Sequence, residues 1–166
     1  MATKASFTAE EWRLLLESPM LAGMAVTAAD PSGLFGLVKE GLAASRALAE
    51  AKTAAGASEL IRAVVADLET TAGRDAARDG LKARFAGAKA ADIKPKSITA
   101  LREVAALLDA KAPEDALAFT AWLEDIARRV AEASKEGGFL GFGGVQVSDA
   151  EKATLTEITA ALNRTV

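Results

Sequence analysis

The chain has 166 residues, of which 51% are hydrophobic but only 5% aromatic, and its formal net charge is −3. A chain of this length suits one domain with a sizeable core, and the mild negative charge argues against a nucleic-acid partner, which usually requires a basic face. Histidine, cysteine and tyrosine are absent. Disulfides, zinc–thiolate sites and histidine-based catalytic triads are therefore excluded, and any metal site would need oxygen ligands alone.

The first predicted helix begins at a capping box, Thr8-Ala9-Glu10-Glu11, and the preceding Phe7 can supply a hydrophobic staple. Ser18-Pro19 is a second helix-start signal, so the sequence predicts a break or kink there, followed by helix over residues 20–29. Asp30-Pro31-Ser32-Gly33 is typical of a turn.

Further helices are predicted from apolar residues spaced three and four apart, over residues 34–54, 59–71, 74–90 and 97–110, from Pro113, and from a second capping box at Ser148. Gly73, Gly80 and Gly87 recur at an interval of seven, which predicts either close packing against a neighbour or a weak helix. Lys94-Pro95 is expected to end that region. The clearest apolar stripe predicts a set of core residues, namely Phe119, Trp122, Leu123, Ile126 and Val130. The prediction is an all-α, single-domain bundle over residues 1–166, with about seven helices.

A glycine-rich segment near the C-terminus, residues 136–147, interleaves Phe139, Leu140 and Phe142 with glycines, among them Gly138, Gly141, Gly143 and Gly144. It does not fit a phosphate-binding loop, because no Gly-Lys-Ser/Thr and no G-x-G-x-x-G register is present and no strand precedes it. Two interpretations stay open. The apolar side chains plug the end of the bundle, or they insert into an apolar partner.

The segment that starts at Ala28 and includes Gly33-Leu34-Phe35-Gly36-Leu37 aligns without gaps on the one that starts at Ala133 and includes Gly138–Phe142. This internal echo raises the hypothesis of a pseudo-twofold relation between the N- and C-terminal helical hairpins. The two turns would then form one apolar patch, made of Leu34, Phe35, Phe139, Leu140 and Phe142. A second copy of the chain is the simplest cover for such a patch, which predicts a homodimer.

Residues 18–36 together with residues 136–152 resemble a family of small, uncharacterised bacterial all-helical proteins that share the loop Glu-Gly-Gly-Phe-Leu-Gly-Phe-Gly-Gly. The resemblance implies an all-helical fold and carries no activity, cofactor or catalytic residue with it. Ala28-Ala29-Asp30 and Val147–Glu151 are similar to the tellurite-resistance helical domains, which implies an oxygen-only metal site. The acidic turn that would bind metal in those domains is otherwise missing here.

Charged residues give little sign of a catalytic or nucleic-acid site. Residues 73–103 hold eight basic and four acidic side chains, and a solvated helix face explains them better than a binding surface. The adjacent acids Glu10/Glu11, Glu114/Asp115 and Glu124/Asp125 stand near helix starts or on outward faces, and none is predicted inside an apolar stripe. No enzyme activity, catalytic residue, metal ligand or cofactor is therefore predicted.

These patterns favour a non-enzymatic structural or interaction protein that self-associates through its glycine-rich turns. One alternative is a binder of an apolar small molecule or lipid, held between alanine-lined helices and gated by Phe139 and Phe142. The other is a tellurite-resistance-like domain with an oxygen-only metal site. Asp30-Pro31 interrupts the apolar residues 20–38, and no secretory signal opens the chain, so no transmembrane segment and a cytoplasmic location are predicted.

Overall fold

The computed structural model of the protein describes residues 2–29, 48, 50, 58–135 and 147–163. Within these ranges the chain is all-α and contains no strand, as predicted. A short 3-10 turn, η1 (Lys4–Ser6), precedes the helices α1 (Ala9–Thr27), α3 (Glu59–Glu69), α4 (Thr71–Arg84), α5 (Ala90–Lys111), α6 (Pro113–Lys135) and α7 (Asp149–Leu162). The glycine-rich turns and their echo lie outside the described residues. So does the predicted helix 34–54, except for Leu48 and Glu50, which are both helical.

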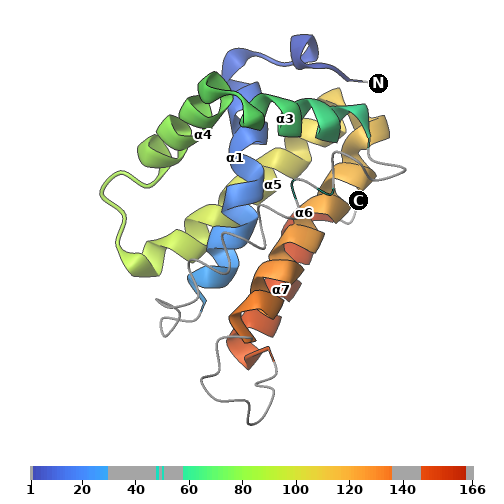
Figure 1. Cartoon of the computed structure of the whole chain (residues 1–166). Coiled ribbons are helices and arrows are strands. Elements are labelled where there is room, and N and C mark those ends of the chain that lie inside the picture. The colour runs from blue at the N-terminus through green and yellow to red at the C-terminus, as the bar shows by residue number, and fades with distance from the viewer. Residues whose placement is uncertain (1, 30–47, 49, 51–57, 136–146, 164–166) are drawn as a thin grey trace.

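Helix α1 is the centre of the bundle, because it packs against α3, α4, α5, α6 and α7. Figure 1 shows α3 and α4 crossing one end of α1, with α5, α6 and α7 placed along the rest of it. The N-terminal segment, residues 2–8, lies at the end of α1 where α3 and α4 also cross. The start of the chain and the α3–α4 corner, which are far apart in the sequence, therefore meet at this end of the bundle.

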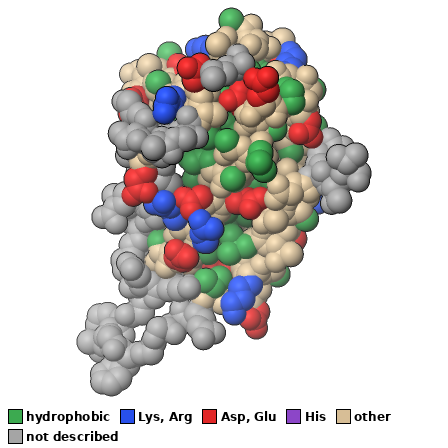
Figure 2. Space-filling view, turned by 90° about the vertical axis from the view of Figure 1, so that its right-hand side faces the viewer, with side chains coloured by type: hydrophobic (Ala, Val, Ile, Leu, Met, Phe, Trp, Pro, Cys, Tyr) green, Lys and Arg blue, Asp and Glu red, His purple; other side chains and the backbone are tan. Residues whose placement is uncertain are grey.

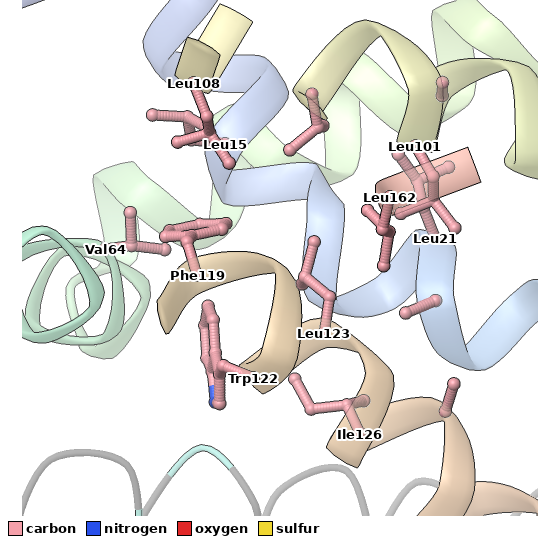
Figure 3. Packing of buried hydrophobic residues seen from close by; sticks show 14 of the residues in the cluster. Leu15, Leu21, Val64, Leu101, Leu108, Phe119, Trp122, Leu123, Ile126 and Leu162 are labelled. Atoms are coloured by element: carbon pink, nitrogen blue, oxygen red, sulfur yellow. The ribbon is translucent and has the colours of Figure 1, made fainter. Parts of the chain in front are cut away.

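The core is built from apolar side chains of all six helices. The ones labelled in Figure 3 are Leu15, Leu21, Val64, Leu101, Leu108, Phe119, Trp122, Leu123, Ile126 and Leu162. The predicted stripe of α6 is confirmed, since Trp122, Leu123, Ile126 and Val130 are all buried. The ring of Trp122 also packs edge-on against Phe119, with ring centroids 5.2 Å apart, a favoured aromatic geometry.

The sequence predicts a break or a kink at Ser18-Pro19, and the break is wrong, because α1 runs through both residues without interruption. Proline has no N–H, so the carbonyl of Leu15, four residues earlier, loses its usual helical donor. The Ser18 hydroxyl donates to this carbonyl at 2.7 Å. A side chain therefore replaces the missing backbone hydrogen bond, and the proline is accommodated inside the helix.

The region between the predicted helices 74–90 and 97–110 also differs from expectation. Helix α4 ends at Arg84 and α5 begins at Ala90, so Pro95 lies inside α5 instead of ending a helix before it. Gly73 and Gly80 are buried within α4, which confirms the predicted close packing for these two. Gly87 does not share their helix. It lies in the intervening turn with φ at +70°, a conformation that glycine adopts without strain.

Candidate ligand-binding groove

A surface groove lies where the N-terminal segment, α1 and the α3–α4 corner meet, and it is called the N-terminal groove below. Its volume is about 460 Å³, within the range of roughly 300–1,000 Å³ that is usual for small-molecule sites. Phe7, Trp12 and Leu16 supply its large apolar side chains. The remaining lining residues are Lys4, Thr8, Ala9, Arg13, Asp67, Ala72, Gly73 and Ala76.

One wall of the groove is set by the start of α1, where the predicted capping box is confirmed. The Thr8 hydroxyl accepts the backbone N–H of Glu11 at 3.2 Å, and the Glu11 carboxylate accepts the backbone N–H of Thr8 at 2.7 Å. The predicted staple is present as well, because the rings of Phe7 and Trp12 lie 5.9 Å apart and tilted by 41°. The cap therefore fixes both aromatic side chains of the groove.

The opposite wall is the tight corner between α3 and α4. The Thr70 hydroxyl donates to the backbone carbonyl of Asp67 at 2.7 Å and accepts the backbone N–H of Gly73 at 3.0 Å. A Cβ added to Gly73 would collide with that same Asp67 carbonyl. The corner closes this tightly only because residue 73 has no side chain.

An acidic side chain and an indole together hold a cation at the rim of the groove. The Asp67 carboxylate accepts hydrogen bonds from the Lys4 ammonium at 2.7 Å and from the Trp12 indole N–H at 2.6 Å. The same ammonium lies 5.7 Å from the centroid of the Trp12 ring, which is cation–π range. Asp67 and Trp12 are called the acid–indole site below.

The hydrogen bond from Lys4, assisted by the one from Trp12, lowers the pKa of Asp67 below its ordinary value. Asp67 is therefore ionised at neutral pH. Its side chain is 18% exposed, whereas that of Lys4 is 62% exposed. The acid thus belongs to the wall of the groove, and the cation reaches it from the solvent side.

A buried carboxylate lies behind the groove, and the sequence interpretation missed it. The side chain of Glu17 is only 3% exposed, between the Arg84 guanidinium at 3.1 Å and that of Arg13 at 3.7 Å. Its carboxylate also packs directly against the backbone of Gly80. The sequence interpretation considered only adjacent pairs of acids and so did not include Glu17, which lies among the buried residues of α1.

Asp115 lies in the first turn of α6, as expected for the Glu114/Asp115 pair, and it is also buried, with only 4% of its surface exposed. Its carboxylate accepts the backbone N–H of Ala2 at 3.2 Å. The N-terminal segment is thus held to α6 through Ala2, to α3 through Lys4 and to α1 through Phe7. Asp115 acts here as a structural anchor for one edge of the groove.

The basic stretch has the solvated character that the sequence indicates. Arg74, Arg78 and Lys82 are exposed on α4, and Arg78 is paired with Asp75 at 2.9 Å. Figure 2 shows that, on the face it presents, hydrophobic side chains form small patches between acidic and basic ones. Among the described residues, the large hydrophobic side chains that are exposed are Met20 and Leu117, and scattered residues of this kind are normal on protein surfaces.

All five residues of the predicted apolar patch, Leu34, Phe35, Phe139, Leu140 and Phe142, lie outside the described residues.

Within the described ranges, no group of three or more acidic side chains is arranged to hold a metal ion. No helix in the described part of the chain is long and apolar enough to cross a membrane.

The sequence interpretation did not find the acid–indole site, although it used Phe7 to predict the staple. Lys4 and Asp67 are 63 positions apart, and both belong to residue types that are normally solvated. The sequence offered only a local indication of the site. Phe7 and Trp12 flank the cap of α1, and Lys4 stands three positions before Phe7.

Comparisons with protein-family models, curated proteins and solved structures give no match for this chain.

Proposed function

We propose that the protein is a non-enzymatic binding protein that holds an apolar small molecule in the N-terminal groove. The observation that carries this proposal is a groove of about 460 Å³ in which Phe7, Trp12 and Leu16 lie beside one ionised carboxylate. Ligand sites usually combine apolar walls with a few placed polar groups. Ala9, Ala72 and Ala76 add the small side chains that a bound molecule can approach closely.

The proposal assigns no covalent step to any residue. Glu17 and Asp115 are deeply buried, and their carboxylates already accept hydrogen bonds from Arg84 and from the Ala2 backbone. These contacts give both acids a structural role, which supports binding over catalysis. Phe139 and Phe142, which were predicted to gate an alanine-lined cavity, lie outside the described residues, so the proposal rests on the described lining of the N-terminal groove alone.

Filling the groove tests the proposal. Ala72 is an exposed α4 residue in the groove lining, so Ala72→Phe should occupy the space that a ligand needs. With decanol as a neutral apolar probe, titration should shift the indole N–H resonance of Trp12 saturably in the unmodified protein. We expect Ala72→Phe to weaken this binding at least about tenfold, the equivalent of about 1.4 kcal/mol.

The matched control is Ala83→Phe, since Ala83 is exposed on the same helix and does not line the groove. It should bind decanol as the unmodified protein does, and circular dichroism should show the same helix content for both variants. Equal binding by Ala72→Phe, or no response of Trp12 to decanol in the unmodified protein, would contradict the proposal.

Self-association through the glycine-rich turns is a second candidate function, and the sequence favours it. Leu34, Phe35, Phe139, Leu140 and Phe142 stand among glycines, and burying one such large side chain is worth roughly 1.5–3 kcal/mol. A homodimer would cover them, with a helix over residues 34–54 as the seventh of the bundle and a pseudo-twofold relation between the hairpins. We also propose a cytoplasmic location for such a protein.

Phe142→Asp is expected to shift the protein toward monomer while its helix content stays intact, because the introduced charge opposes burial of the patch. Sedimentation measures the assembly, and a thermal melt measures the stability of the same sample. Leu117→Asp is the control, since Leu117 is 77% exposed on α6 and lies outside the predicted patch. Unchanged assembly together with a large drop in melting temperature would instead identify Phe142 as part of a core plug.

A further inference from the structure

We propose that the ligand of the N-terminal groove is an organic ammonium ion on an apolar tail, and that its ammonium replaces that of Lys4 between Asp67 and Trp12. This inference rests on the proposed binding function and names the chemical class of the ligand. The Lys4 side chain is itself an alkylammonium, so the protein already shows how such a group fits the acid–indole site.

The acid–indole site offers two favourable contacts to one cation. The Asp67 carboxylate is 2.7 Å from the ammonium that now occupies it, and the Trp12 ring centroid is 5.7 Å away. The indole N–H donates to the same carboxylate oxygen at 2.6 Å, which fixes the acid in place. An ammonium is therefore bound by a held negative charge and by the face of an aromatic ring.

Lys4 is a weak competitor for this site. Its side chain is 62% exposed, and the contact holds a long flexible side chain in one geometry, so this ion pair contributes little to stability. A ligand ammonium would make the same two contacts and would add the burial of its tail against Phe7 and Leu16. The displaced lysine would return to solvent at small cost.

A ligand carboxylate fits the groove less well. It would meet the ionised Asp67 at the rim, and like charges at short distance repel each other. The other cation in the lining, Arg13, already faces the Glu17 carboxylate at 3.7 Å. A neutral ligand would gain the apolar contacts but neither the carboxylate nor the cation–π contact.

Three probes with the same tail separate these classes: decylammonium, decanol and decanoate. Each is titrated into the full chain at submicellar concentration, and the Trp12 indole N–H resonance reports binding beside Asp67. We expect decylammonium to bind about five- to tenfold more tightly than decanol. Decanoate should bind most weakly.

Two variants give results of opposite sign. Lys4→Ala should bind decylammonium about two- to fivefold more tightly than the unmodified protein does, because the competing ammonium is gone. Asp67→Asn keeps an oxygen that can accept the Trp12 indole N–H but removes the charge, so it should bind decylammonium and decanol equally. Lys82→Ala removes an exposed lysine of α4 outside the groove and should change neither affinity.

The outcomes distinguish failure of the inference from failure of the function. Equal binding of decanol and decylammonium by the unmodified protein overturns the inference and leaves an apolar groove. A preference for decanoate that is lost in Lys4→Ala overturns it too, and makes the groove an anion site. If no probe shifts the Trp12 resonance in either the unmodified protein or Lys4→Ala, both the inference and the proposed function fail.

Discussion

Replacing Gly73 with alanine is expected to lower the free energy of unfolding by about 3 kcal/mol, at the upper end of what overpacking usually does. The added Cβ would collide with the backbone carbonyl of Asp67, and the next nearest atoms are also backbone. A flexible side chain could move aside, but the last turn of α3 cannot. The Thr70 cap that joins the two helices would be strained as well.

Gly23→Ala is the matched control, because Gly23 is also a glycine inside a helix. A Cβ there would meet only the side chain of Val130 at 3.6 Å, an ordinary van der Waals contact. Alanine is favoured over glycine in a helix by about 1 kcal/mol, so this variant should be neutral or more stable. Urea denaturation of the two variants gives the comparison, and a difference below about 0.5 kcal/mol would show that the corner is not closely packed.

The Gly73 prediction also concerns the groove. Gly73 lines it, and the backbone that would have to move belongs to Asp67, whose carboxylate holds the Lys4 ammonium. If the corner opens, the Trp12 indole loses its fixed acceptor. The same glycine therefore supports both the packing of α4 on α3 and the geometry of the acid–indole site.

The sequence predicts the parts of this fold that depend on neighbouring residues. The capping boxes at Thr8 and Ser148 each involve a partner three positions away, and both are present. The buried stripe of α6 follows from apolar residues at helical spacing, because one face of a helix must meet the core. Local chemistry fully determines these features.

The features that the sequence did not reveal depend on contacts between distant parts of the chain or on compensation within a helix. Pro19 suggests a helix break because proline cannot donate a backbone hydrogen bond to the Leu15 carbonyl. The sequence alone does not show that the Ser18 hydroxyl supplies that hydrogen bond instead. Glu17 looks like a surface acid until Arg84, 67 positions away, is placed beside it. Lys4 and Asp67 come together only because α3 packs across α1 in the folded chain. No periodicity in the sequence predicts that packing.

Loss of the Arg84 guanidinium is the second large effect expected for this protein. Arg84→Met should lower the free energy of unfolding by about 3 kcal/mol, because it leaves the Glu17 carboxylate, 3% exposed, without its nearest cation. Arg13 remains, but at 3.7 Å its contact is longer. Arg84 also pairs with Glu103, whose side chain is 49% exposed, so Glu103→Ala should have an effect of less than about 1 kcal/mol.

The double variant Glu17→Met/Arg84→Met is expected to be more stable than Arg84→Met alone. Methionine has nearly the length of glutamate and adapts to irregular space, and it leaves no buried charge beside Gly80. Replacing a buried ion pair with apolar side chains is often neutral, whereas removing one partner is strongly destabilising. Chemical denaturation of Glu17→Met, of Arg84→Met and of the double variant, each compared with the unmodified protein, gives the coupling energy directly. If the double variant is the least stable of the three, Glu17 and Arg84 stabilise the fold through contacts other than their own ion pair.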